Sequence, residues 1–362
     1  YSTGLESLLK AIHWSMQIGD ASCALASLAW IVVPCLQQGK LSFGLEYCNK
    51  VESWLQEYQL HNISMVSTLH RVRIILLREQ GHLELAEHEL HLMQYFYPNL
   101  DPLNLAYCYW AEFLLLLAQK NYDKARQQLS ILEGHAAAHF DGWQLALPKP
   151  ALLSAVLDTL AGSELAMLNW ASQFQLAHID NDDVWLKATD ITVQSEVIAY
   201  MRIRITLGSD MSLECDQLIE QAELKQDCLL ALHGLILKVL NASRQGDELS
   251  LTHYRHRLLN RAGILEFHQV YKEYLDELLP LLLNYQVLPS ELTGHERIVP
   301  SSAITVKVLE AIPQQHQVIN ESKLFASLTL REQQICLLVI EGFSNKEIAI
   351  HSAISLATVK GH

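Results

Sequence analysis

The stretch AQKNYDKARQQLSILEGHAAAHF, residues 118–140, contains the two signals that decide the fold. It has a polar break at 120–122 and then an apolar stripe at three-to-four spacing, made by Ala125, Leu129, Leu132, Ala136 and Phe140. This spacing places the apolar side chains on one face of a helix. A polar break followed by an amphipathic helix predicts one arm of a helical hairpin.

Similar breaks divide most of the chain, centred on Gly19, Gly39, Gly81, Asn121, Gly162, Gly208 and Gly246. The first two breaks are 20 residues apart, and the following breaks are separated by 42, 40, 41, 46 and 38 residues. A period of about 40 fits two helices joined by a tight turn, which is typical of a helical solenoid. We therefore expect a helical-repeat array over residues 1–285, with an irregular helical bundle as the alternative.

A small residue lies five residues after Gly19, Gly39, Gly81 and Lys120, namely Ala24, Gly44, Ala86 and Ala125. A small side chain there allows the second helix of a hairpin to pack closely against the first. The segment 120–125 resembles the middle of a tetratricopeptide repeat, although that repeat has a shorter period, about 34 residues. The expected fold class is all-α, a tetratricopeptide-like αα-hairpin solenoid followed by a truncated helix-turn-helix.

Composition agrees with a helical protein. The 362 residues are 50% hydrophobic and include only 15 Gly and 9 Pro, too few for a protein built of many short strands and turns. The longest apolar runs, 25–33 and 113–118, are shorter than the roughly 18–20 residues of a membrane span. The first residues show no basic n-region and no cleavage site, and no CxxC pair occurs, so we expect a cytoplasmic segment of a longer protein, with free thiols and no membrane partner.

The net charge of −14 is unevenly distributed. In the last 35 residues, Arg331, Lys346 and Lys360 balance Glu332, Glu341 and Glu347, so the whole acidic excess lies before residue 328. An acidic surface repels the phosphate backbone of nucleic acids. Any contact with DNA must therefore come from the C-terminal segment.

The pattern changes after residue 284, where Pro289, Pro300 and Pro313 occur among Ser, Thr and Gln. We interpret residues 286–325 as a linker, and residues 326–362 as a separate domain. In that domain, Thr329-x-x-Glu332 and Ser344-x-x-Glu347 are capping boxes, which begin helices. Gly342 between them suits a helix end, and Ser355 can cap a third helix. Three short helices at this spacing predict a helix-turn-helix.

The same segment resembles the LuxR-type DNA-binding domain. The matching residues are Leu328-Thr329-x-Arg331-Glu332, Gly342-x-Ser344-Asn345-Lys346-Glu347-Ile348-Ala349 and Ile354-Ser355-x-x-Thr358-Val359-Lys360-x-His362. The resemblance implies four helices, of which the third enters the major groove and the fourth dimerises. The expected DNA-binding residues are Lys346, Ser355, Thr358, Lys360, Gly361 and His362. Because the chain stops at His362, we expect most of the recognition helix and the fourth helix to be absent.

The order of repeat array, linker and LuxR-type domain resembles the large ATP-binding regulators of the LuxR family. That resemblance implies a nucleotide-binding module upstream and a small-molecule inducer on the repeats. The nearest approach to a phosphate-binding loop is Gly39-Lys40, but Leu41 replaces the required Ser or Thr, and Pro34 stands where the first Gly should be. We therefore expect no cofactor in this chain, and ATP with Mg²⁺ only in an upstream module.

Other candidate sites are weaker. His135 and His139 have a spacing that metals can use, but no third ligand is recognisable, so we expect no metal site. Aromatic residues gather at 95–97 and at Tyr107, Tyr109 and Trp110, where core packing is a commoner reason than ligand binding. No catalytic residues stand out, so an enzyme is not expected.

The function predicted from the sequence is that of a ligand-responsive bacterial transcription activator. Its array would sense a small effector through residues that the sequence does not identify, and its C-terminal helix-turn-helix would bind promoter DNA. Self-association and RNA polymerase are further partners to consider. The alternative is a tetratricopeptide-like scaffold for protein–protein interaction, with no DNA binding by this chain.

Overall fold

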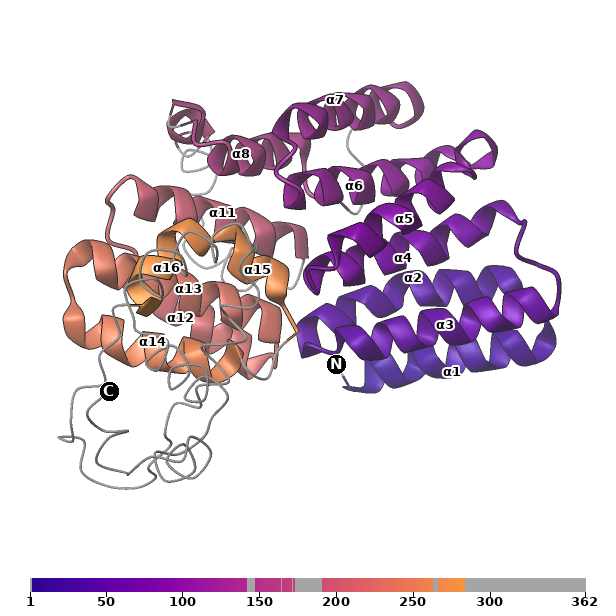
Figure 1. Cartoon of the computed structure of the whole chain (residues 1–362), viewed down its shortest axis with the longest axis horizontal. Coiled ribbons are helices and arrows are strands. Elements are labelled where there is room, and N and C mark those ends of the chain that lie inside the picture. Colours follow the sequence, from indigo (N-terminus) through magenta and orange to yellow (C-terminus); the bar gives the residue numbers. More distant parts are fainter. Residues whose placement is uncertain are drawn as a thin grey trace, which may run out of the picture. The chain divides into compact units, whose positions relative to one another are not determined.

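The computed structural model describes residues 2–141, 147–163, 165–170, 172, 191–262 and 266–283, and every regular element in these ranges is helical (Figure 1). The chain divides into two compact units, Tyr1–Tyr254 and Arg255–His362. The all-α prediction is therefore confirmed. The predicted domain boundaries at 285 and 325 fall outside the described residues and stay predictions.

The α-helices are α1 (Ser2–Ile18), α2 (Ala21–Gln38), α3 (Leu41–Glu57), α4 (Ser67–Glu79), α5 (Leu83–Gln94), α6 (Pro102–Ala118), α7 (Tyr122–His139), α8 (Pro150–Leu160), α11 (Ile191–Thr206), α12 (Ser212–Leu224), α13 (Cys228–Gln245), α14 (Glu248–Ala262), α15 (His268–Glu273) and α16 (Leu275–Leu283). Two short 3₁₀ helices, η1 (Ser64–Val66) and η2 (Tyr97–Asn99), lie between the longer elements.

One type of turn recurs along the first unit. Nine residues in the described ranges have a positive φ, and each ends a helix: Gly19, Gly39, Gln59, Gly81, Lys120, Gly162, Gly208, Gln226 and Gly246. The next residue then donates its backbone N–H to the carbonyl five residues back, as from Lys40 to Cys35 at 2.9 Å. This bond belongs to the Schellman motif, which satisfies carbonyls at a helix C-terminus.

These turns refine the repeat predicted from the sequence. Six of the seven predicted breaks are glycines with positive φ, and at the seventh the left-handed residue is Lys120 rather than Asn121. Gln59 and Gln226 are additional turns of the same kind. They divide two of the five longer steps, from Gly39 to Gly81 and from Gly208 to Gly246, so that in these stretches a turn follows each single helix about every 20 residues.

The turn is short because the next helix begins almost at once. Side chains of Asp20, Asn121 and Asp227 accept backbone N–H groups in the first turn of α2, α7 and α13. The predicted small residues follow: Ala24, Ala86 and Ala125 have no exposed surface, and Gly44 is buried. A Cβ on Gly44 would lie 2.7 Å from Leu76 Cδ1. The sequence prediction of close helix packing at these positions is thus confirmed.

The helices pair as hairpins, and the hairpins stack. Contacts are densest within α1–α2, α4–α5, α6–α7 and α12–α13, while α2, α4 and α6 contact one another in succession. Helix α3 packs on both α2 and α4, and α13 packs on α11 and also on α2. At this last contact Gln37 donates a hydrogen bond to the carboxylate of Asp227, whose pKa is raised by burial.

Helix α2 is the described helix that is long and apolar enough to cross a bilayer. Its neighbours α1, α3, α4 and α13 cover most of its surface, so that Leu25, Leu28 and Ile31 have no exposed area. Its apolar composition is accounted for by its central place in the array.

The close packing at Gly44 can be tested by comparison with Gly134, a helical glycine that has free space around it. A Cβ added to Gly134 in α7 would have no atom within 4 Å, so Gly134→Ala should stabilise the protein by about 0.5–1 kcal/mol through helix propensity. Gly44→Ala should gain nothing, and Gly44→Val should destabilise by about 1–3 kcal/mol because the side chain meets Leu76. Urea unfolding measures these changes. Equal effects of alanine at both sites would contradict the close packing.

Candidate functional site

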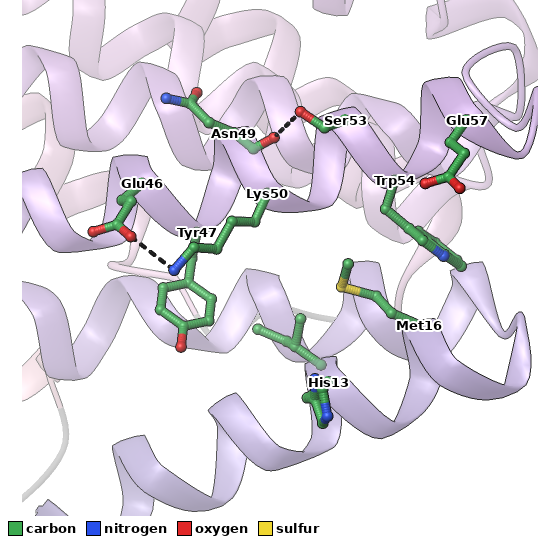
Figure 2. A pocket seen from close by; sticks show the side chains of 10 residues that line it. His13, Met16, Glu46, Tyr47, Asn49, Lys50, Ser53, Trp54 and Glu57 are labelled. Carbon is green, nitrogen blue, oxygen red and sulfur yellow. Dashed lines mark hydrogen bonds and ion pairs between the residues drawn. The ribbon is translucent and has the colours of Figure 1, made fainter.

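A pocket of about 670 Å³ lies between α1 and α3 (Figure 2). Helix α1 contributes Ile12, His13 and Met16, and α3 contributes Glu46, Tyr47, Asn49, Lys50, Ser53, Trp54 and Glu57. This volume falls within the range of roughly 300–1,000 Å³ that is usual for small-molecule sites. The sequence analysis named none of these residues as a site.

Helical periodicity explains why these residues meet. Tyr47, Lys50, Trp54 and Glu57 follow one another at three-to-four spacing, which places them on one face of α3. Figure 2 shows Tyr47 and Trp54 extending from α3 toward the helix that carries Met16. Their two rings are two helical turns apart, about 10 Å along the axis. The pocket is therefore an elongated slot with an aromatic side chain near each end.

At one end of the slot, the positive charge of Lys50 is paired with a carboxylate. Lys50 Nζ lies 2.7 Å from Glu46 Oε1 and 4.5 Å from the centre of the Tyr47 ring. The hydrogen bond from Lys50 to Glu46 raises the pKa of this lysine. The positive and negative charges at this end thus compensate each other.

The other end has two groups that lack partners. Trp54 is only 6% exposed, yet its Nε1–H has no hydrogen-bond acceptor among the described residues. Glu57, one turn further along α3, is exposed and forms no ion pair with a described residue. A buried indole N–H usually finds an acceptor, so this end is the chemically unsatisfied part of the slot.

Behind the slot, α3 is tied to the next hairpin by buried polar contacts. Arg73 of α4 donates from Nη2 to Asn49 Oδ1 at 2.7 Å and to Glu52 Oε2 at 2.6 Å. Its Nη1 lies 3.4 Å from Glu89 of α5, and Glu89 Oε2 is 2.6 Å from Nδ1 of His70. Asn49 belongs both to this network and to the slot lining, so the two are directly connected.

The aromatic residues noted in the sequence form a different cluster. Tyr97 donates its hydroxyl hydrogen to Glu112 at 3.0 Å, and its ring meets the Tyr109 ring edge to face. The Tyr109 ring in turn contacts His135, whose ring is tilted by 33° against that of His139 with ring centres 4.3 Å apart. These rings join η2, α6 and α7, consistent with the packing role that the sequence favoured.

The two histidines use ring nitrogens for hydrogen bonds. His135 Nε2 lies 2.9 Å from the carbonyl oxygen of Pro102, and His139 Nδ1 lies 2.9 Å from the carbonyl oxygen of His135. Within the described ranges, no group of three potential ligands surrounds them. The two histidines therefore contribute hydrogen bonds to the packing of α7.

All the predicted DNA-binding residues lie outside the described residues: Lys346, Ser355, Thr358, Lys360, Gly361 and His362. The same holds for the predicted linker and for the capping boxes at 329–332 and 344–347. Their roles stay predictions.

Comparison with known protein families supports the C-terminal prediction directly. Residues 326–362 match the family described as bacterial regulatory proteins of the luxR family. This match begins at the predicted domain boundary and includes every residue of the quoted motif. Residues 326–362 are thus similar to the LuxR family of bacterial regulatory proteins.

Similarity to particular proteins extends over most of the chain. The HTH-type transcriptional regulator MalT of Cronobacter sakazakii is 25% identical over 353 residues, which cover 90% of this chain and 37% of that protein. MalT proteins of Yersinia enterocolitica and Yersinia pestis are each 24% identical, with the same coverage. The chain thus spans about 37% of the length of the curated relatives it matches, and it is similar to a MalT-like regulator of the LuxR family.

The buried network behind the slot should contribute strongly to stability. Arg73→Leu leaves the Glu52 and Glu89 carboxylates without their cation, which should lower the free energy of unfolding by about 3–5 kcal/mol. Lys50→Ala removes an exposed ion pair on the same helix face and should change stability little. Urea unfolding of both variants provides the comparison. A mild effect of Arg73→Leu, similar to that of Lys50→Ala, would show that the network is not a structural tie.

Proposed function

We propose that this chain is the sensing and DNA-binding part of a ligand-responsive bacterial transcription activator. The LuxR-family match at residues 326–362 is the observation that carries the DNA-binding half of this proposal. The slot between α1 and α3 supports the sensing half, because it is a ligand-sized cavity on the repeat array. The similarity to MalT regulators extends over 90% of the chain.

The distribution of charge supports effector binding by the array and DNA binding by the C-terminal segment. The net charge of −14 arises entirely before residue 328, so the array disfavours the phosphate backbone of DNA. The C-terminal segment has balanced charges, and its Lys346 and Lys360 occur in the helix-turn-helix pattern. Promoter DNA is thus assigned to residues 326–362, and a small effector to the array.

The contacts behind the slot suggest how an effector could be sensed. Helix α3 contributes seven of the slot residues and also holds Arg73 through Asn49 and Glu52. A ligand that shifts α3 must therefore change the contacts of Arg73 with α5 through Glu89. A ligand regulates a protein only if it binds two packing arrangements with different affinity, and a change in these helix contacts would provide such a difference.

The DNA-binding role is tested at Lys360. In the complete protein, Lys360→Ala should weaken binding to operator fragments selected from genomic DNA. A lost base contact costs about 1–3 kcal/mol. If Lys360 contacts phosphate instead, the salt dependence of binding should fall by about one unit of slope. Fluorescence-anisotropy titrations at two salt concentrations measure both quantities.

The matched control is Lys124→Ala, which removes an exposed lysine from the array in α7 and should leave DNA affinity unchanged. Unchanged affinity of Lys360→Ala at both salt concentrations would remove this residue from the DNA interface. Failure of the complete protein to bind any genomic fragment, combined with capture of a peptide by the array, would favour the scaffold function instead.

A further inference from the structure

We propose that the contact between α2 and α13, which we call the latch, opens separately from the hairpin stacks, because Gln37 and Asp227 hold it incompletely while Asp227 is ionised. The inference goes beyond the proposed function, since it concerns how the array closes on itself and requires no effector. It gives the array two arrangements, latched and open, and the charge of one carboxyl group shifts the balance between them.

The latch differs from the other helix contacts of the array. Helices α2, α4 and α6 contact one another in succession, and short turns join each helix of a hairpin to the next. Helix α13 instead contacts α2 across a long stretch of chain, since Gln37 and Asp227 are 190 positions apart. No turn joins these two helices, so the latch holds only through its own interactions. Its opening leaves the α1–α2 and α12–α13 hairpins intact.

The polar interaction in the latch is incomplete. Gln37 and Asp227 are 6% and 3% exposed, and the amide of Gln37 donates a hydrogen bond to the Asp227 carboxylate. The other polar atom of the same amide, Gln37 Oε1, is buried and has no donor among the described residues. An ionised carboxylate only accepts hydrogen bonds, so it cannot supply the missing donor. A buried acceptor without a donor weakens the contact that contains it.

A proton on Asp227 completes this interaction. A protonated carboxyl group has one O–H donor and keeps an acceptor oxygen, which matches the acceptor and the donor of a carboxamide. Asp227 also caps α13, since its Oδ1 accepts the backbone N–H of Leu230 at 3.0 Å. Oδ1 can remain an acceptor while Oδ2 carries the proton. The protonated pair therefore satisfies Gln37 without loss of the helix cap.

Burial sets the direction of the pH dependence. It raises the pKa of Asp227, and the hydrogen bonds from Leu230 and Gln37 and the charge of Lys225 lower this pKa by less. The carboxyl group thus binds its proton more tightly in the latched array than in the open one. The latch is therefore strongest below the ordinary pKa of an aspartate, and it weakens as the pH rises through the raised pKa.

Another titratable group of α13 acts in the opposite direction. His233 faces Arg202 of α11 and Arg78 of α4, and burial together with these two charges lowers its pKa to about 4. Its protonation in acid therefore disfavours the packing of α13. Lys238 is paired with Asp216 of α12 and keeps its charge. Comparison of variants at the same pH cancels the contribution of His233, so the test is built on such comparisons.

The test uses the whole chain and Asp227→Asn. Asparagine has the same shape, is an equally good helix cap, and carries the donor that the ionised carboxylate lacks. At pH 7 this change should slow hydrogen exchange about 3- to 10-fold in the last turns of α2 and the N-terminal half of α13, as measured by mass spectrometry. Gln37→Leu leaves the buried carboxylate without its donor and should accelerate exchange in the same segments.

The matched control is Asp20→Asn, the same substitution at the exposed cap of α2, where Asp20 accepts the N–H of Cys23. It should leave exchange in both segments unchanged. The difference in exchange between the wild type and Asp227→Asn should shrink as the pH falls toward 5, because the wild-type carboxyl group then takes up its own proton. Thermal unfolding of each variant shows whether its fold is intact.

Three outcomes would overturn the latch. The first is exchange that Asp227→Asn does not slow, or that Asp20→Asn slows equally. The second is a difference between wild type and Asp227→Asn that stays constant as the pH falls. The third is an equal change of exchange in every helix, which would show that the contact does not open separately. These measurements use neither DNA nor an effector, so their failure leaves the proposed function intact.

Discussion

A single residue in the left-handed backbone conformation ends most helices of the first unit, and the arrangement of its helices depends on this turn. Because the next helix starts at once, it must pack directly on the one before, and small residues such as Ala24 and Gly44 make this approach feasible. Turns at Gly19 and Gly39 place both α1 and α3 on α2. The slot lies between these two helices because α2 supports each of them.

Most of this architecture could be predicted from the sequence, because glycine marks a left-handed turn. Gln59 and Gln226 adopt the same conformation, but their side chains give no local signal of it, and at the third such turn the sequence marked Asn121 rather than Lys120. There the turn is imposed by the packing of the adjoining helices, which a single sequence does not display. The predicted period of about 40 residues for two helices agrees with the turn that follows each helix in the regular stretches, and the helical class and the hairpin arrangement were predicted correctly.

The candidate site was harder to foresee for a related reason. Tyr47 and Trp54 have the spacing of a core stripe, and periodicity does not distinguish a face that meets a neighbouring helix from one that lines a slot. The network around Arg73 joins residues 16 to 24 positions apart in sequence, on three helices. By contrast, the LuxR-type segment is recognisable from local order alone, since its capping boxes and motif residues are contiguous within residues 328–362.

The contact of α13 with α2 has a consequence for the whole first unit. In an open solenoid each repeat touches only its neighbours, and stability is approximately a sum of local terms. Here Gln37 and Asp227 join helices that are about 190 residues apart in the chain. This hydrogen bond must break before the α1–α2 hairpin can separate from the α12–α13 hairpin. This contact therefore gives a disturbance of α2 a direct route to α13 that does not pass through the intervening hairpins.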